Sequence, residues 1–498
     1  MDGLMTLLTS NAGRSDPSTP AQAQADEHPR ETNVNVAGTI SEQESQETDD
    51  EILDAFRTHR LQFLPLIYIP ITTTAGDLKR EAPFLWRCIS AVECKDTTRQ
   101  AALCVGIREL AGKRLLLDCD RSLDLLQGIL VYLAWITFQS QPQKSSLCVY
   151  AQMAIALVFE LGLNKPVPPD LNQTISNSNI VEQMPGLQAS ISTMRTMNER
   201  RTVLSCFVLT SIIAQFLGRM DPLRWTPHMK ECLDVLTQTE ESPGDAALVQ
   251  ITRTRLVADQ ILQGFWADGL YGLSSSNARA SFHLKALESQ LRTNKAEIPP
   301  QLTNTRPILF HIYDTEICLY EAALVRPPAD EEMSSLRLDH LYSCLDVVKQ
   351  SLDLFLTMHP AEYTALALSH LAQLSHCFVT LFRLSTFDYP GWDKVAVKDT
   401  VDILTIAEQL STSLGQVAGA VGLRSEGVNS DPYSKLGMMM QKLRSQWAAR
   451  LPELSGVEVE SSSNDLFLLN MQMDDLGNFM NWSEVLWMTE GSGQGFAV

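Results

Sequence analysis

The sequence is short of basic residues for its length. Its 498 residues include 39 Lys and Arg against 59 Asp and Glu, which gives a formal net charge of −20 at pH 7. Nucleic-acid binding depends on clustered Lys and Arg that neutralise phosphates. The sequence contains no Lys- and Arg-rich run and no obvious nuclear import signal. We therefore expect the chain to be a poor nucleic-acid binder on its own.

Cysteine is absent from residues 1–87, and no two of the ten later cysteines show the two-residue gap typical of zinc ligands. Most of the ten lie among apolar neighbours, which is typical of buried, reduced thiols. The first residues lack the positive region of a secretory signal. The longest apolar stretch, Leu125–Phe138, has about 14 residues, fewer than the ~20 of a membrane helix. We expect a soluble, intracellular protein that does not act at a membrane.

Motifs of phosphate binding and catalysis are missing as well. The sequence has no G-x-x-x-x-G-K-[ST] loop, no H-E-x-x-H zinc motif and no hydrolase nucleophile elbow. The histidines are dispersed: His370 and His376 are six residues apart, which puts them on different faces of a helix, and Cys377 points elsewhere again. We therefore expect no catalytic residue, no cofactor and no metal site, and no enzymatic activity.

Two clusters of carboxylates keep one enzyme class open. Class I terpene cyclases hold Mg²⁺ and a diphosphate with such clusters, and this chain has carboxylates in Asp49–Asp54 and at Asp474-Asp475. A matching second metal motif of Asn, Ser and Glu is not present. We interpret the first cluster as a solvated acidic run at a helix start. A Mg²⁺-dependent, terpene-cyclase-like enzyme is thus the least favoured alternative.

Charge divides the chain into three parts. Residues 1–55 hold 12 acidic and 2 basic side chains, and residues 451–498 hold 8 acidic and no basic ones, which leaves a net −2 for residues 56–450. Residues 1–50 are polar and have almost no aromatic side chains, so they cannot bury enough apolar surface to fold. We predict a disordered acidic arm at 1–50, a helical domain at 51–450 and an acidic-hydrophobic tail at 451–498.

The central part has the pattern of an all-α protein. Apolar residues recur at i, i+3, i+4 and i+7 through long segments, while alternating β-branched runs are scarce. One strand-like stretch occurs at Ile67–Thr74. Four N-terminal signals with proline stand at Thr226-Pro227, Ser242-Pro243, Arg306-Pro307 and His359-Pro360. They predict helices over His228–Leu236, Asp245–Trp266, 306–326 and 359–384.

Glycines and further loops complete this pattern. Leu161-Gly162 closes a helix that starts near Ser145. Loops are expected at 165–194, 274–279, 329–334, 388–393 and 423–431. No repeat of 30–45 residues is visible, which argues against a regular solenoid. The predicted fold is one large multi-helix domain.

Three segments carry a family resemblance through their order and spacing. The first, Ser122–Trp135, contains Leu125-Leu126-Gln127 and is apolar on most sides, which predicts burial in a large core. The second ends in Leu161-Gly162-Leu163. The third runs from Arg200-Arg201 to Leu217-Gly218-Arg219, with Met220 where the family has proline. This order resembles the fungal-specific transcription factor domain, also called the middle homology region, most clearly over residues 80–240.

The resemblance implies a helical regulatory domain and a nuclear role in transcription. The family's usual DNA reader is a six-cysteine, two-zinc cluster near the N-terminus, and the cysteine-free residues 1–87 do not match it. The arrangement is similar to that of regulators of fungal secondary-metabolite gene clusters that lack the zinc cluster, such as the trichothecene pathway's regulator. It implies action through the transcription machinery, a DNA-binding partner protein or a DNA contact outside the zinc cluster.

The tail is compatible with that role on physical grounds. Leucine and aromatic residues alternate there with carboxylates, as at Leu466-Phe467-Leu468-Leu469 and around Trp482 and Trp487. Such alternation is typical of activation segments, because like charges keep the apolar side chains exposed for a partner groove. A terminal helix that docks on the domain remains open as an alternative for the tail. For the whole chain, a helical module that senses a small apolar metabolite is the second functional hypothesis.

Overall fold

A computed structural model describes the backbone of residues 48–136, 147–167, 195–218, 220–239, 241–267, 277–324, 335–427 and 431–455. The chain divides into two units, Met1–Gln46 and Glu47–Val498, and the described residues all belong to the second. Within these ranges the regular elements are helices, and the one isolated β-bridge joins Asp96 to Arg424. The predicted all-α class is confirmed.

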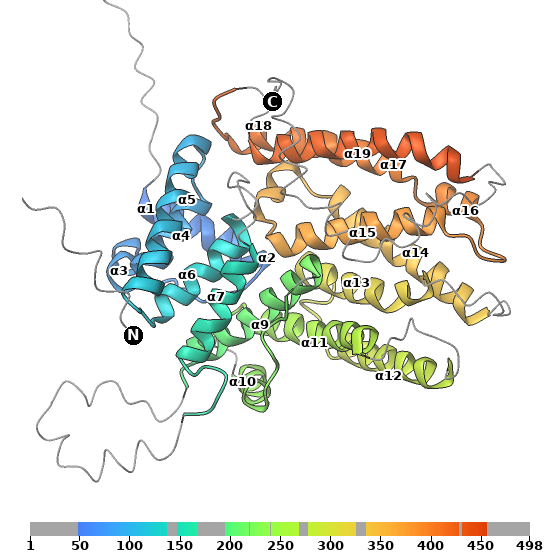
Figure 1. Cartoon of the computed structure of the whole chain (residues 1–498). Helices are drawn as coiled ribbons and strands as arrows, with labels where there is room; N and C mark the ends of the chain where they lie inside the picture. Colours follow the sequence, from blue (N-terminus) through green and yellow to red (C-terminus); the bar gives the residue numbers. More distant parts are fainter. Residues whose placement is uncertain are drawn as a thin grey trace, which may run out of the picture. The chain divides into compact units, whose positions relative to one another are not determined.

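The first half of this unit is built around one apolar core, the first core, drawn from residues 53–251, from four residues of α13 and α15, and from Ala367, which precedes α15. Its helices run from blue to green in Figure 1. Its elements are α1 (Asp49–Ala55), η1 (Phe56–Arg60), α2 (Leu61–Phe63), α3 (Ala75–Glu81), α4 (Pro83–Val92), α5 (Thr97–Gly112), η2 (Lys113–Leu117), α6 (Leu123–Val131), η3 (Tyr132–Ile136), α7 (Leu147–Glu160), α9 (Met197–Leu217) and α10 (Pro227–Gln238).

The second half surrounds two further cores. The second core is drawn from residues 310–447, and the small third core from α11, α12 and α13. The elements here are α11 (Asp245–Ala267), α12 (Asn277–Ala296), α13 (Arg306–Tyr320), η6 (Glu321–Leu324), α14 (Ser335–Leu356), η7 (Pro360–Ala365), α15 (Leu368–Thr386), α16 (Lys394–Thr400), α17 (Ile403–Gly415), α18 (Val417–Val421) and α19 (Pro432–Ser455). Their colours run from green through yellow to red in Figure 1, where α9 and α11 lie side by side.

Helix α13 joins the three cores. Ile312 belongs to the first core, Ile317 to the second and Cys318 to the third. The helix packs against α11, α14 and α15. Polar groups on α13 therefore lie where the three apolar clusters meet, and this junction positions the site described below.

The helix that sequence periodicity predicts at Ser122–Trp135 is buried as expected. Every residue from Leu125 to Ile136 is buried. Ser122 caps α6 by accepting a hydrogen bond from the Leu125 N–H at 3.3 Å, and the last turns continue as the π-helical segment η3. The indole Nε1–H of Trp135 donates to the Ala365 carbonyl at 3.3 Å, which satisfies a polar group that burial would otherwise leave unpaired.

Predicted helix ends are confirmed where capping chemistry sets them. Thr226 accepts a hydrogen bond from the Met229 N–H at 3.3 Å, with Pro227 at the first helical position of α10. Gly162 and Gly218 follow α7 and α9 with φ of 65° and 63°, a left-handed conformation that glycine adopts at little cost. The residues before Leu147 in the predicted α7 lie outside the described ranges.

Other predicted boundaries are wrong. The strand-like stretch Ile67–Thr74, which contains Pro70, forms no strand, as the predicted all-α class requires. The single helix predicted over 359–384 is broken between η7 and α15, where Leu366 and Ala367 adopt extended backbone and Trp135 binds the Ala365 carbonyl. Residues 277–279, predicted as loop, begin α12.

The loop predicted at 388–393 is confirmed. Those at 168–194, 274–276, 329–334 and 428–430 lie outside the described residues. Within the described chain, α9 is long and apolar enough to cross a membrane, with 83% of its most apolar window buried inside the domain. Burial of this kind is typical of the central helix of a folded core.

Candidate functional site

Ionisable side chains are buried at the junction of α11, α13 and α15. Asp314 and Cys318 are four residues apart on α13, and Glu321 follows in η6, so all three lie on one side of the helix. His376 and Arg383 are seven residues apart on α15 and face that side. Arg255 completes this group, the junction cluster, from α11 with 2% of its residue surface exposed.

The charged groups of the junction cluster form one chain of contacts. His376 Nδ1 lies 2.9 Å from Asp314 Oδ1, and its Nε2 lies 3.2 Å from Glu321 Oε2. The Arg255 guanidinium is 3.5 Å from the second oxygen of Asp314, and Arg383 is 3.5 Å from Glu321. Each carboxylate thus has two cationic neighbours, as buried carboxylates require.

The contacts within the junction cluster shift the pKa values of His376 and Asp314. Burial by itself lowers the pKa of His376, but Glu321 and Asp314 outweigh it and raise that pKa to about 10. Burial acts to raise the pKa of Asp314, but the hydrogen bond from His376 outweighs it, and the pKa is lowered. His376 is therefore an imidazolium cation at neutral pH, clamped between two carboxylates.

A second set of polar groups extends the junction cluster towards the first core. Gln373 Nε2 lies 3.1 Å from His311 Nδ1, and the rings of His311 and His370 are 5.8 Å apart. Burial lowers the pKa of His311 to about 4 and the pKa of His370 to about 3, so both are neutral. Four buried atoms in this region have no hydrogen-bond partner: Arg255 Nη2, His311 Nε2, His370 Nε2 and Gln373 Oε1.

Three residues of the junction cluster carry atoms of the kinds that can bind a metal ion. One carboxylate oxygen of Asp314, the Sγ of Cys318 and one ring nitrogen of His376 all lie within 4.8 Å of one another. The Nε2 of Gln215, on α9, lies 3.1 Å from the same sulfur. No metal site is predicted from sequence motifs, and neither Asp314 nor Cys318 belongs to such a motif.

A signal for these residues is present in the sequence. Residues 311, 314, 318 and 321, which are His, Asp, Cys and Glu, recur at spacings of three, four and three, which places them on one face of a helix. The partner His376 was singled out by sequence, but only against His370 and Cys377. The structure separates these: His376 contacts Asp314, His370 packs on Phe310, and Cys377 donates to Ser351.

The Arg200-Arg201 pair of the family pattern has a structural role. Arg201 is 4% exposed at its side chain and forms a two-pronged pair with Asp245, with N–O distances of 2.7 and 2.9 Å. It also stacks on the Tyr68 ring at 4.9 Å. Arg200 donates to the Arg195 carbonyl and reaches Cys232 Sγ at 3.7 Å. Both guanidinium groups therefore fasten α9 to its neighbours.

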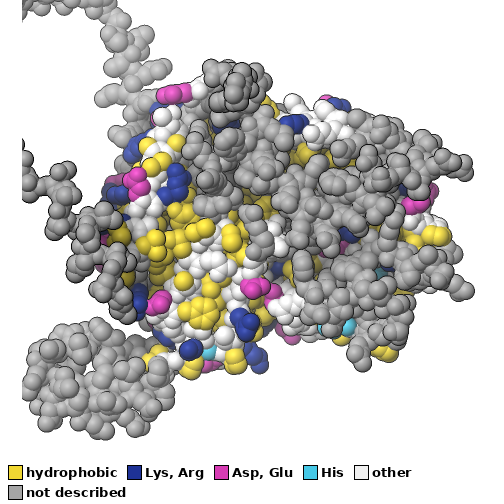
Figure 2. All heavy atoms as spheres, in the orientation of Figure 1, with side chains coloured by type: hydrophobic (Ala, Val, Ile, Leu, Met, Phe, Trp, Pro, Cys, Tyr) yellow, Lys and Arg dark blue, Asp and Glu magenta, His cyan; other side chains and the backbone are white. Residues whose placement is uncertain are grey.

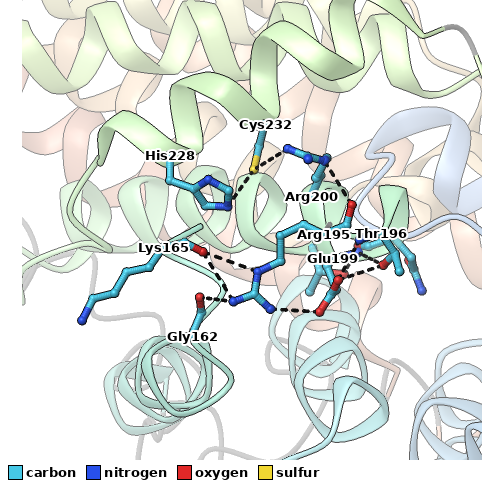
Figure 3. A network of polar contacts seen from close by, with 10 residues as sticks. Gly162, Lys165, Arg195, Thr196, Glu199, Arg200, His228 and Cys232 are labelled. Atoms are coloured by element: carbon cyan, nitrogen blue, oxygen red, sulfur yellow. Dashed lines mark hydrogen bonds and ion pairs between the residues drawn. The ribbon is translucent and has the colours of Figure 1, made fainter. Parts of the chain in front are cut away.

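Arg195 links the start of α9 to the end of α7 through hydrogen bonds and an ion pair. Figure 3 shows its guanidinium between the carbonyls of Gly162 and Lys165 and the carboxylate of Glu199, while His228 and Arg200 flank the Cys232 sulfur. Glu199 also closes a capping box with Thr196. The motif residues at 162 and 200 thus belong to one polar network that fixes the α7–α9 corner.

The acidic cluster at the start of the domain also has a structural role. Asp49 and Asp50 lie in the first turn of α1, where carboxylates favour the helix N-terminus. Asp50 accepts a hydrogen bond from the Ala75 N–H at 2.7 Å, and Asp49 pairs with Lys79. The prediction of a helix start is confirmed. Asp474 and Asp475, like the rest of the tail, lie outside the described residues.

The described surface has no basic stripe on the face shown in Figure 2. Lys and Arg side chains are scattered there among acidic and apolar ones. All ten cysteines fall within described helices or their connections, and seven of them are buried. They do not assemble the six-cysteine cluster that the family uses to read DNA.

Comparisons with known proteins give a consistent class of relatives. Residues 360–493 match the family model ATEG07667_C, described as a C-terminal domain. The transcription factor opdL of Penicillium oxalicum is 66% identical over 495 residues, which cover 99% of this chain and 87% of that protein. No solved structure matches the chain.

More distant relatives carry the same description. The transcription factor himD of Aspergillus japonicus is 25% identical over 62% of this chain, and pbcR of Emericella nidulans is 23% identical over 80%. The matched residues cover about half of each of these two proteins, 50% and 52%.

Proposed function

The chain belongs to the family of fungal transcription factors, and from this membership we propose that it controls the genes of a secondary-metabolite biosynthetic cluster in the nucleus. Regulation of transcription follows from the family itself. The observation that carries the proposal is 66% identity over 99% of the chain to a protein named as a transcription factor. The middle-homology pattern and the acidic tail support the finer role.

We propose that recruitment to DNA occurs through a partner protein. The chain carries a net charge of −20, and residues 1–87 contain no cysteine. Phosphate neutralisation would need a basic surface, and the described side chains coloured in Figure 2 form no basic stripe. A DNA-binding partner would supply that surface, while the helical domain at 51–450 supplies the contact to the partner.

We further propose that residues 451–498 activate transcription. The segment has eight carboxylates and no basic residue, interspersed with leucine and aromatic side chains. Such a segment can lay its apolar residues into a coactivator groove while its charges keep it soluble. An enzymatic role is not part of this proposal, because Asp49 and Asp50 are engaged in holding α1 to α3.

A reporter assay tests the tail. Residues 451–498 fused to a foreign DNA-binding domain are expected to activate a reporter gene. The matched control replaces Trp482, Leu486 and Trp487 by Ala, which keeps all eight carboxylates and removes apolar anchors. Activation by the first fusion and its loss in the second support the proposal. No activation by the first, beside an active positive control and equal protein levels, contradicts it.

A further inference from the structure

Three side chains of the junction cluster bring together atoms of the kinds that bind metals, although they form no known metal-binding sequence motif. Asp314 and Cys318 lie one turn apart on α13, and His376 faces them from α15. Their donor atoms lie within 4.8 Å of one another. We propose that Asp314, Cys318 and His376 bind a divalent transition-metal ion, and that zinc suits the site best.

The donor set decides the kind of metal. A thiolate and an imidazole select a borderline-soft ion, and one carboxylate with them is compatible with tetrahedral zinc. Zinc–ligand bonds of about 2.0–2.3 Å place neighbouring donors roughly 3–4 Å apart. The Asp314 and His376 atoms are already 2.9 Å apart. The Cys318 sulfur lies within 4.8 Å of both, so the site forms when the side chains draw closer around the ion.

The surroundings of His376 are those of a metal-bound histidine. With Nδ1 on the metal, the Nε2–H would donate to Glu321, whose oxygen is 3.2 Å away. Ligating histidines generally donate their second ring N–H to a carboxylate in this way, which fixes the ring and increases its basicity. Arg383 holds Glu321 in turn.

Gln215 on α9 is the candidate for a fourth ligand. The Gln215 amide is next to the Cys318 sulfur through its Nε2, at 3.1 Å, while its Oε1 is buried without a hydrogen-bond partner. Rotation of the amide by half a turn exchanges the two atoms. The oxygen would then lie beside the Cys318 sulfur, and an ion that it reached would join α9, α13 and α15.

The charge of the junction cluster permits the exchange. Binding of a dication releases one proton from the His376 ring and one from the Cys318 thiol, so the net charge of the buried groups does not change. Arg255 and Arg383 keep their places beside Asp314 and Glu321. The ligands come together only when α13 and α15 pack at this junction. Bound metal therefore stabilises the folded domain, because it binds the folded state and not the unfolded chain.

Cobalt substitution of the purified, tag-free full chain tests the site. We expect one tightly bound equivalent of Co²⁺, with a thiolate-to-cobalt charge-transfer band and tetrahedral d–d bands. Cys318→Ser is expected to lose the charge-transfer band and to bind the ion at least tenfold more weakly. Cys344→Ser is the matched control, since Cys344 is equally buried and lies outside the junction cluster. It should keep both the band and the affinity.

A second measurement needs no variant. X-ray absorption of the zinc-loaded wild-type chain should show one sulfur and several nitrogen or oxygen ligands. Absence of a stoichiometric ion, a band that survives in Cys318→Ser, or a first shell with no sulfur or with two or more would each overturn the proposal.

Discussion

Gly128 shows how one residue sets the distance between two helices. A Cβ built on Gly128 of α6 would lie 2.3 Å from the Phe84 ring of α4, well inside van der Waals contact. We expect Gly128→Ala to lower the free energy of unfolding by about 1–3 kcal/mol, because the overpacked ring cannot move without strain. Gly112→Ala, where no atom lies within 4 Å of the new Cβ, is the control and should raise it by about 0.5–1 kcal/mol. Chemical denaturation measures both, and an unaffected Gly128→Ala protein contradicts the packing.

Arg201 tests the buried ion pair of α9. Arg201→Ala leaves Asp245 buried without its guanidinium, and we expect a loss of about 3–5 kcal/mol of unfolding free energy. The double variant Arg201→Ala with Asp245→Ala should lose less than the sum of the two single losses, because it removes the orphaned charge as well. A strictly additive double-mutant cycle in urea would show that the pair is not coupled.

The buried His370 makes stability depend on pH. Its pKa is lowered to about 3 by burial, from an ordinary value of 6.5, so the unfolded chain binds a proton that the folded chain refuses. The contribution of His370 to stability is complete above pH 6.5 and is lost as the pH drops towards 3, with a loss of about 2 kcal/mol at pH 5. His370→Asn keeps an acceptor for the Ala367 N–H and should flatten this dependence relative to wild type. If the unfolding free energy of wild type and of His370→Asn fell equally between pH 7 and pH 5, the assignment to His370 would be wrong. The control is His59→Asn, because His59 is exposed.

At the scale of elements, capping chemistry carried the sequence predictions. Thr226-Pro227 and Leu161-Gly162 mark helix ends correctly because each signal acts within one turn of chain. The continuous helix predicted over 359–384 is wrong because its break depends on a distant partner. The indole of Trp135 donates to the Ala365 carbonyl, 230 residues away in sequence, at the break before α15. Periodicity alone carries no information on such a contact.

The Thr226 cap offers a direct test at this scale. Its hydroxyl accepts from the Met229 N–H and donates to the Asn164 carbonyl at 3.0 Å, so it joins α10 to the end of α7. Thr226→Ala should lower the unfolding free energy by about 1–2 kcal/mol. Thr237→Ala, an exposed position in the same helix, should leave it nearly unchanged. Equal effects of the two substitutions in thermal unfolding would show that the cap contributes nothing.

The junction cluster shows where prediction of the site stops. His311, Asp314, Cys318 and Glu321 form a polar line that the sequence displays. Their meeting with His376 and Arg255 requires α11 and α15 to pack on α13, which no local pattern specifies. The cluster therefore depends on tertiary contacts that cannot be predicted from composition and residue spacing.

At the scale of the whole molecule, acidity is concentrated in the two ends of the sequence and apolar residues in its middle. Residues 56–450 carry a net −2, whereas the two ends carry the remaining −18. A nearly neutral helical domain can pack tightly, and a net charge far from zero favours solubility. The all-α class and the family were predictable because composition and motif order act over the whole chain.

The central claim is that this chain regulates transcription of a biosynthetic gene cluster through a DNA-bound partner. Chromatin immunoprecipitation of the tagged full chain, combined with transcript measurement after deletion of its gene, tests it most directly. We predict enrichment upstream of a co-regulated set of biosynthetic genes, lost when a zinc-cluster partner is removed, and a fall in those transcripts in the deletion strain. No enrichment above an untagged strain, together with unchanged transcripts, would contradict the account.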